Sequence, residues 1–386
     1  MKKYAKRICI ILSKMILYVV WLFPHKKRVF FYADQGLRDN IGVLYHYMIK
    51  NNFQEHYEII CAFEKNQDIP RQTVANVIFT SKIPGIIYFF ISQYAFYSFG
   101  FYPVKPCEKQ MVVNLWHGMP LKAIGYLEHG RKHEMLNCFS KLLVTGDCFI
   151  EMMQKAFGCS ENQILKNGQP KSDLLYTPLK PGLSDLRKQY KKVILWLPTF
   201  RSSMLIPYDN TTDSISMDCM RNDESATERF SKLNCFLSRY NVLLILKNHP
   251  IQNIKGSCHN ITNYSNIARA YQLGVTNEYE LMKVSDALIT DYSSISFDYM
   301  LLDRPIGYII DDFEEYRRER GFMMEEALDY MPGKKIYNYG DIVQFVKECM
   351  EGSDSFREKR NQMSKRINQY VEQDNSHALL KQIGII

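Results

Sequence analysis

The sequence predicts an α/β protein built of two Rossmann-like domains. Short apolar runs alternate with helical stretches along most of the chain, and this alternation is typical of doubly wound parallel sheets. The stretch PLKPG at 178–182 divides the runs into two series. A chain of 386 residues that is 46% hydrophobic is long enough for two domains with separate cores.

The first series lies before this stretch. Its runs are rich in β-branched and aromatic residues and are separated by helical stretches. The expected strands are Arg28–Ala33, Tyr57–Ala62, Val77–Thr80, Ala95–Gly100, Met111–Trp116, Lys141–Thr145 and Gln163–Lys166. The apolar run 83–99 is expected to form a core helix and a strand, because its polar Ser92 and Gln93 argue against a membrane span.

The second series of apolar runs lies after the PLKPG stretch, and helical stretches again separate the runs. Its expected strands are Val193–Leu197, Val242–Leu246, a weak Ala268–Ala270, Ala287–Thr290 and Ile306–Ile309. Residues 202–228 are rich in Ser, Thr, Asp and Asn, and they predict a long loop, either over an active site or as a solvated insertion without function. Residues 341–383 are expected to be helical.

The net charge of +8 is concentrated at the amino terminus. Residues 1–28 contain eight basic and no acidic residues, so 41 basic residues remain against 41 acidic ones. We expect a membrane-associating segment at 1–27, a first domain at 28–180 and a second at 181–386. No nucleic-acid partner is expected, because the bulk of the chain lacks a basic stripe interleaved with aromatics.

The apolar run 8–23, ICIILSKMILYVVWLF, lies between seven of these basic residues and is interrupted by Ser13 and Lys14. It is shorter than the roughly 20 residues of a spanning helix, and no small-residue cleavage site follows it. An interfacial helix on an anionic membrane surface is the favoured interpretation, with Trp21 at the headgroup level. A buried first helix packed on the domain is the alternative.

The ten cysteines include no CxxC pair and no close Cys/His ligand spacing. Reduced thiols in the cytosol are therefore the expected state, and no metal site or cofactor is expected.

A strand followed at once by hydroxyls is the most informative motif. The run Ala287–Thr290 leads into Asp291, Tyr292, Ser293 and Ser294, and an apolar-periodic helix follows. Hydroxyls and free backbone N–H groups at the carboxyl end of a strand suit a phosphate or pyrophosphate. The alternatives are an ordinary helix N-cap for either serine and a turn or cap for Asp291.

Two other strand ends carry matching chemistry. His117 and Gly118 follow the run ending at Trp116, with Pro120 suited to a first helical turn. Lys247 and His249 follow the run Val242–Leu246. A histidine at a strand exit is often only a surface or capping residue, but three polar strand ends together predict one ligand crevice.

These residues carry a family resemblance. The motifs WHGMPLKAIGY, KNGQPKSDLLY, LPTFR, LKNHP, ITDYSSISFDY, DRPIGYIIDDFEEYRRERGF and MPGK occur in this order over about residues 32–335. The ordered set resembles the CDP-glycerol glycerophosphotransferases of teichoic acid synthesis. The resemblance implies a GT-B-like glycosyltransferase arrangement of the two domains, in which the last helix crosses back to the first domain.

The resemblance also implies a reaction. It is transfer of glycerol phosphate, or a related alditol phosphate, from CDP-glycerol to a hydroxyl of a lipid-linked saccharide or polymer acceptor at the cytoplasmic face of the membrane, with release of CMP. We expect the first domain to bind the acceptor and the second to bind the CDP-alditol. Such a transfer needs positioning and charge neutralisation more than covalent help from the protein.

The matching motifs suggest a role for each candidate residue. His117 is the expected general base, since an unperturbed imidazole pKa of about 6.5 suits neutral conditions, and His249 is the other candidate. The expected donor pyrophosphate ligands are His249, Arg201, Lys247, Ser293 and Ser294, with Asp291 orienting a histidine or fixing the loop. Gly118 and Arg320 are further candidate contacts, although an arginine in so charged a segment often forms only a surface ion pair.

Two other function classes share these features. A GT-B glycosyltransferase or sugar-nucleotide epimerase would have the same fold and pyrophosphate site. A non-catalytic nucleotide or lipid-pyrophosphate binding module is the third possibility, and measured turnover separates it from both enzymes.

Overall fold

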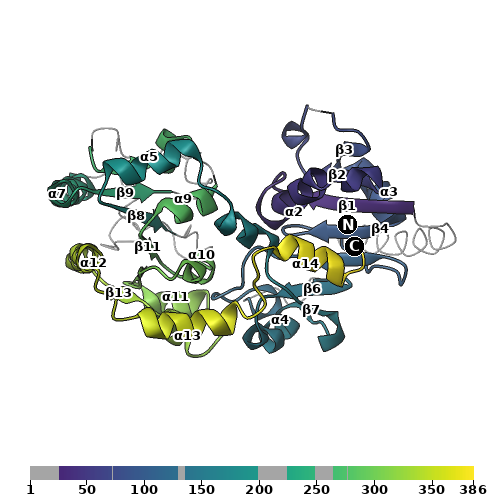
Figure 1. Cartoon of the computed structure of the whole chain (residues 1–386). Helices are drawn as coiled ribbons and strands as arrows, with labels where there is room; N and C mark the ends of the chain where they lie inside the picture. Colours follow the sequence, from purple (N-terminus) through teal and green to yellow (C-terminus); the bar gives the residue numbers. More distant parts are fainter. Residues whose placement is uncertain (1–25, 72, 129–134, 199–223, 248–263, 276) are drawn as a thin grey trace. The chain divides into compact units, whose positions relative to one another are not determined.

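The computed structural model describes residues 26–71, 73–128, 135–198, 224–247, 264–275 and 277–386. These residues form two compact units (Figure 1). Unit 1 takes its residues from Met1–Met119, Gly130–Asp173 and Gln369–Ile386, and unit 2 from Pro120–His129 and Leu174–Asn368. The apolar run 8–23 and residues 202–223 of the predicted loop lie outside the described residues. The loop prediction is wrong for residues 224–228, which begin helix α7 (Glu224–Tyr240).

Unit 1 contains a seven-stranded parallel sheet of order β3-β2-β1-β4-β5-β6-β7. Its strands are β1 (Lys26–Ala33), β2 (Glu58–Phe63), β3 (Val77–Ser81), β4 (Ser92–Tyr97), β5 (Met111–Asn114), β6 (Lys141–Val144) and β7 (Ile164–Lys166). Most of these strands are buried runs, as expected when helices cover both faces of a parallel sheet.

Helices cover both faces of this sheet. They are α2 (Asp39–Lys50), α3 (Lys82–Ile91), α4 (Ile150–Phe157) and α14 (Asn375–Gln382). Helix α2 places Ile41, Leu44 and Met48 on one stripe, and these side chains share a core cluster with Leu379 and Leu380 of α14. The carboxyl-terminal segment is therefore part of the core of unit 1.

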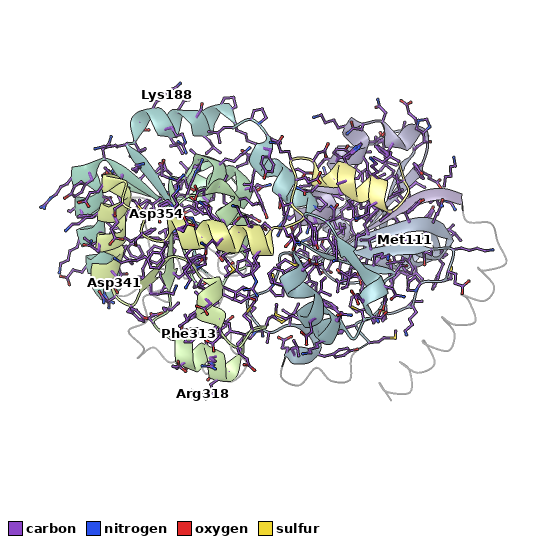
Figure 2. All side chains as sticks on the ribbon, turned by 60° about the horizontal axis from the view of Figure 1, so that its bottom comes forward. Met111, Lys188, Phe313, Arg318, Asp341 and Asp354 are labelled. Carbon is purple, nitrogen blue, oxygen red and sulfur yellow. The ribbon has the colours of Figure 1, made fainter. Side chains whose placement is uncertain are left out.

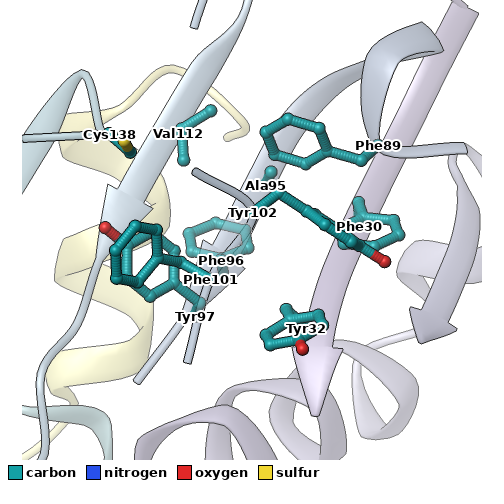
Figure 3. Close-up of a pocket in the computed structure, with 10 residues that line it drawn as sticks. All are labelled: Phe30, Tyr32, Phe89, Ala95, Phe96, Tyr97, Phe101, Tyr102, Val112 and Cys138. Carbon is teal, nitrogen blue, oxygen red and sulfur yellow. The ribbon is translucent and has the colours of Figure 1, made fainter. Parts of the chain in front are cut away.

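A small cavity of about 10 Å³ lies in the aromatic part of this core (Figure 3). Phe30 of β1 and Phe89 of α3 meet edge to face beside it, with ring centroids 5.7 Å apart. A volume of this size holds about one water molecule, so the cavity is a packing feature and not a ligand site.

Unit 2 contains a six-stranded parallel sheet of order β10-β9-β8-β11-β12-β13. Its strands are β8 (Lys192–Leu197), β9 (Val242–Leu246), β10 (Ile267–Arg269), β11 (Ala287–Thr290), β12 (Ile306–Ile309) and β13 (Lys334–Ile336). The order reverses between β8 and β11, and ligands of Rossmann-like sheets bind at such a switch point, outside the carboxyl ends of the strands.

The helices of unit 2 are α5 (Pro181–Gln189), α7 (Glu224–Tyr240), α9 (Glu278–Val284), α10 (Ile295–Tyr299), α11 (Phe313–Glu319), α12 (Tyr339–Glu351) and α13 (Arg357–Ile367). Phe230, Leu233 and Leu237 of α7 and Phe345 of α12 share one core cluster with the sheet. Phe313 and Arg318 mark α11 in Figure 2.

The strand predictions agree closely with the structure. Strands β9, β11 and β12 have the predicted bounds, whereas β4 begins at Ser92 and not at Ala95. Strand β13 was not predicted. The helical turn expected at Pro120 is wrong: Lys122 forms an antiparallel bridge with Phe322, and no helix begins there.

The compact units have other bounds than the predicted domains, which met at 180/181. Pro120–His129 lies in unit 2 because Ala123 donates its backbone N–H to the Gly321 carbonyl at 3.0 Å. Gln369–Ile386 lies in unit 1 because its apolar side chains fill that core. The chain therefore passes four times from one unit to the other.

Within the described ranges, no helix is both long and apolar enough to cross a membrane.

Candidate active site

His117 lies in a tightly held turn directly after β5. Trp116, the residue before it, has a φ of 54°, and Gly118 has a φ of 130°. A non-glycine residue at positive φ costs about 1–3 kcal/mol, so the surrounding bonds must hold it. Asn114 accepts a hydrogen bond from the Trp116 N–H at 2.9 Å, and Asn40 donates to the Trp116 carbonyl at 2.8 Å.

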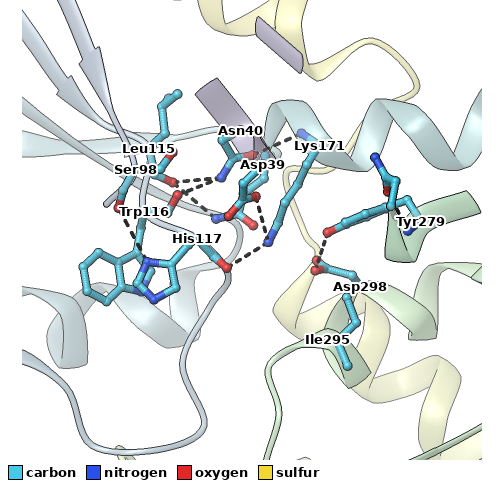
Figure 4. A network of polar contacts seen from close by, with 12 residues as sticks. Asp39, Asn40, Ser98, Leu115, Trp116, His117, Lys171, Tyr279, Ile295 and Asp298 are labelled. Atoms are coloured by element: carbon cyan, nitrogen blue, oxygen red, sulfur yellow. Dashed lines mark hydrogen bonds and ion pairs between the residues drawn. The ribbon is translucent and has the colours of Figure 1, made fainter. Parts of the chain in front are cut away.

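The His117 ring is held as well as its backbone. It stacks on Phe99 with centroids 4.4 Å apart and planes at 16°, and it also contacts the Trp116 ring at 4.0 Å. Its Nδ1 lies 3.5 Å from the Ser98 carbonyl oxygen, and the ring is half-buried (Figure 4). His117 is thus a fixed imidazole at the carboxyl edge of the sheet, not a loose surface side chain.

Lys171 also holds this turn in place. Its Nζ donates to the His117 carbonyl at 2.8 Å and lies 3.4 Å from an Asp39 carboxylate oxygen (Figure 4). Its backbone N–H donates to the Asn40 side chain at 3.1 Å. Lys171 is 5% exposed, so this ammonium is a buried part of the architecture around His117.

The sequence did not reveal this role of Lys171, because Asp39 and His117 lie far away along the chain. Asp173, next to it, accepts hydrogen bonds from the backbone and side chain of Asn375 and from Ser376. This carboxylate fixes the start of α14. The motif KNGQPKSD therefore serves the internal structure of unit 1.

Replacing Lys171 by methionine is expected to lower the free energy of unfolding by about 3–5 kcal/mol, because it leaves the Asp39 carboxylate, whose side chain is 14% exposed, and the His117 carbonyl without their cation. Urea unfolding followed by circular dichroism measures this. Lys155→Met is the matched control, since its pair with Glu151 is exposed and such pairs contribute about 0–1 kcal/mol. Equal effects of the two substitutions would contradict the supporting role of Lys171.

In unit 2, the predicted phosphate turn follows β11 at the switch point of the sheet. Asp291 and Tyr292 are 1% and 0% exposed, whereas Ser293 and Ser294 are half-buried. Ser294 makes no side-chain bond that caps α10, and Ser293 Oγ accepts only a long 3.4 Å bond from the Ile295 N–H. The N-cap interpretation therefore does not account for Ser294.

Aromatic rings surround this turn. Tyr292 lies 4.2 Å from the Tyr316 ring and 5.4 Å from the Phe322 ring, between centroids, and its hydroxyl donates to Asp312 at 2.8 Å. A hollow of about 260 Å³ opens beside Phe322; it is lined by Arg317, Phe322, Met323, Met324 and Glu325.

Charged side chains gather near the backbone bridge between Lys122 and Phe322. Arg320 forms an ion pair with Glu128 at 2.6 Å, and its side chain is 44% exposed, as in the ion-pair alternative considered for this residue. Burial lowers the pKa of Lys122, and the charge of Arg320 lowers it further, while Asp291 and Glu128 oppose the shift. Sequence reasoning did not include Lys122 among the site residues, although it lies five residues after His117.

Three candidate site residues remain: Lys247, Arg201 and His249. Lys247 lies at the end of β9, where its Nζ donates to Glu278 at 3.1 Å with 20% of the side chain exposed. Arg201 and His249 lie outside the described residues. His117 and Gly118 belong to unit 1, and Lys247, Asp291, Ser293, Ser294 and Arg320 belong to unit 2.

Comparison with known proteins gives a consistent result. Residues 15–384 match the model of the family described as CDP-Glycerol:Poly(glycerophosphate) glycerophosphotransferase. A teichoic acid glycerol-phosphate primase of Bacillus subtilis (strain 168) is 30% identical over 255 residues, which cover 65% of this chain and 58% of the primase. The teichoic acid ribitol-phosphate polymerase TarL of Staphylococcus aureus (strain NCTC 8325 / PS 47) is 25% identical over 360 residues, 86% of this chain and 59% of TarL. The chain thus spans about three fifths of the length of these relatives.

A solved structure supports the fold. A histidine variant of the wall teichoic acid polymerase TagF soaked with CDPG has a TM-score of 0.71, with 18% sequence identity, and the match covers 99% of this chain and 97% of that one. The predicted fold class, two Rossmann-like domains in a GT-B-like fold, is confirmed.

Proposed function

Because its family model matches almost the whole chain, the protein belongs to the CDP-glycerol:poly(glycerophosphate) glycerophosphotransferase family, and from this membership we propose that it transfers an alditol phosphate from a CDP-alditol to an acceptor hydroxyl in teichoic acid or capsule-type polymer synthesis. The observation that carries the proposal is the turn Asp291–Ser294. It places two hydroxyls at the switch point of a Rossmann-like sheet, and Ser294 makes no capping bond.

The proposed reaction uses residues of both units. The acceptor oxygen attacks the phosphorus that bears the alditol, the bond from this phosphorus to the oxygen of CMP breaks, and CMP leaves with the electron pair. His117 takes the acceptor proton, since a fixed imidazole at a strand end is suited to general base catalysis. Lys247, Ser293 and Ser294 hold the pyrophosphate and stabilise its growing charge, together with Arg201 and His249.

The names of the relatives guide the choice of donor, and the structure around His117 supports its role. The relatives include enzymes named for glycerol phosphate and for ribitol phosphate, so we propose a CDP-alditol donor, with CDP-glycerol as the first candidate. We also propose a lipid-linked saccharide or polymer as the acceptor. The buried support of the His117 turn by Lys171 and Asn40 is what a positioned catalytic group requires.

Product analysis tests this function. The protein is incubated with CDP-glycerol or CDP-ribitol and a lipid-linked disaccharide, and the products are identified by mass spectrometry. We expect CMP and an acceptor heavier by one or more alditol phosphates. Transfer of a sugar from a nucleotide-sugar, epimerisation of that sugar or binding without turnover would contradict the proposal.

We further propose that the protein acts as a peripheral enzyme at the cytoplasmic face of the membrane. Seven basic residues in 1–28 flank the apolar run 8–23 and Lys14 lies within it, and each basic residue near an anionic surface contributes about 1 kcal/mol. A lipid-linked acceptor would then be reached without leaving the bilayer surface.

Deleting residues 1–25 is expected to leave a folded enzyme that no longer binds anionic vesicles, because β1 begins at Lys26 and keeps its pairing with Ser92. Vesicle sedimentation measures the loss, and turnover on a short soluble acceptor should survive. Binding of the intact protein should weaken as salt rises, since screening acts on the basic residues and not on apolar burial. Unfolding of the truncated protein would favour the buried-helix alternative, and unchanged vesicle binding would place the membrane contact elsewhere.

A further inference from the structure

Three residues near the carboxyl ends of neighbouring strands form a row across the sheet of unit 2. Trp196 of β8 is the register partner of Leu246 of β9, and Leu246 is the partner of Arg269 of β10. Register partners in parallel strands project from the same face of the sheet. Trp196, Leu246 and Ile267, which lies two residues before Arg269, share one core cluster, in agreement with this geometry.

Both ends of this row are buried hydrogen-bond donors that the described part of the chain does not satisfy. Trp196 is 0% exposed and Arg269 is 2% exposed. Nε1 of Trp196 and Nε and Nη2 of Arg269 have no hydrogen-bond partner there, and no ion pair to Arg269 is found among the described residues. A buried polar group without a partner costs about 1–3 kcal/mol, and a charged one costs more.

Another buried arginine of unit 2, Arg360, forms ion pairs within the protein. Arg360 is 0% exposed, and it pairs with Asp354 at 2.6 Å and with Asp303 at 3.1 Å. Among the described residues, no acid pairs with Arg269, although this side chain is only 2% exposed. A donor-only cation kept in this state calls for acceptor groups beyond the described residues, and a bound ligand can supply them.

A nucleotide whose phosphates bind at the proposed site after β11 can extend to this row. In the order β10-β9-β8-β11, Arg269 is three strands away from β11, which leads into Ser293 and Ser294. At 4.7–4.9 Å per strand this is roughly 14 Å, a span that a nucleoside diphosphate can bridge. Trp196 lies between these ends, on the strand next to β11.

We propose that Arg269 binds the base of the donor nucleotide and selects cytosine over uracil; this inference rests on the proposed function of the same site. The guanidinium offers parallel N–H donors and no acceptor. Cytosine presents O2 and N3 as two adjacent acceptors, whereas uracil carries a hydrogen on N3 that opposes an arginine donor. Trp196 Nε1 donates to a ribose or phosphate oxygen, which is common to both nucleotides.

The test compares CMP and UMP binding to the full chain by titration calorimetry. We expect wild-type protein to bind CMP about 10- to 100-fold more tightly than UMP, as a charged hydrogen bond allows. Arg269→Met should lower CMP affinity by this factor and leave UMP affinity nearly unchanged. Arg269→Gln, which presents an acceptor to uracil N3–H, should shift the ratio further towards UMP.

Stability provides a readout that separates ligand binding from a structural role. Without ligand, Arg269→Met should be at least as stable as wild-type protein in urea unfolding, because it removes an unpaired buried charge. Arg239→Gln, at an exposed position of α7 in the same unit, is the control and should change neither affinity nor stability.

Two results overturn the inference. An unchanged CMP-to-UMP ratio in Arg269→Met and Arg269→Gln shows that another group reads the base. Equal loss of both affinities together with lower stability shows a structural role. If wild-type protein binds neither CMP nor CDP-glycerol, the proposed donor site fails first and this inference with it.

Discussion

Replacing His117 by alanine is expected to lower kcat about 10²- to 10⁴-fold, the usual contribution of a general base, while the Kd of the CDP-alditol changes little. The fold should survive, because Asn40 and Lys171 hold the turn through the carbonyls of Trp116 and His117, which alanine retains. The rate of a single turnover at saturating donor measures the chemical step.

His56→Ala is the matched control, since His56 is an exposed histidine of the same unit. Added imidazole should restore part of the lost rate if the missing group is a base, since it can enter the space that the ring leaves. Near-normal turnover in a folded His117→Ala protein would exclude His117 as the base and leave His249 as the candidate.

Replacing Ser293 and Ser294 together by alanine is expected to raise the Kd of CDP-glycerol about 10²- to 10⁴-fold. Each hydroxyl donates to a charged phosphate oxygen, and such a bond contributes about 1.5–3 kcal/mol. Stability should change little, because Ser294 makes no capping bond and the Ser293 bond is long. Calorimetric titration with CDP-glycerol measures the affinity.

Ser353→Ala/Ser355→Ala is the control for this pair, at two exposed serines of the same unit. Unchanged affinity of the Ser293/Ser294 variant would place the pyrophosphate at another strand end. A large loss of stability would instead indicate that the hydroxyls hold the turn itself.

The strands were predictable because buried parallel strands read as short apolar runs. The exceptions have local causes. Ser92 interrupts the run of β4, but its hydroxyl donates to the Tyr88 carbonyl at 2.6 Å, so it is a satisfied polar residue inside a strand. Strand β13 is three residues long and begins with Lys334 and Lys335, which hide the apolar signal of Ile336.

The candidate site was predictable only where the motif itself carries the chemistry. The strand ends with His117 and Ser293 are contiguous in the sequence. The contacts that support these residues join distant parts of the sequence, so they could not be predicted from it. Lys171 donates to the His117 carbonyl, and Lys122 pairs with Phe322, some 200 residues away along the chain. The state of Arg269 has no sequence signature at all, since it is defined by the lack of a partner among the described residues.

The crossing of the chain between the units fixes the order in which the protein is completed during synthesis. The core of unit 1 includes Leu379, Leu380, Ile383 and Ile385, so these residues must leave the ribosome before this core is closed. Unit 2 is already whole by Asn368. Unit 1 therefore finishes folding after unit 2, and a nascent or truncated chain that ends before residue 369 exposes the apolar surface that α14 covers.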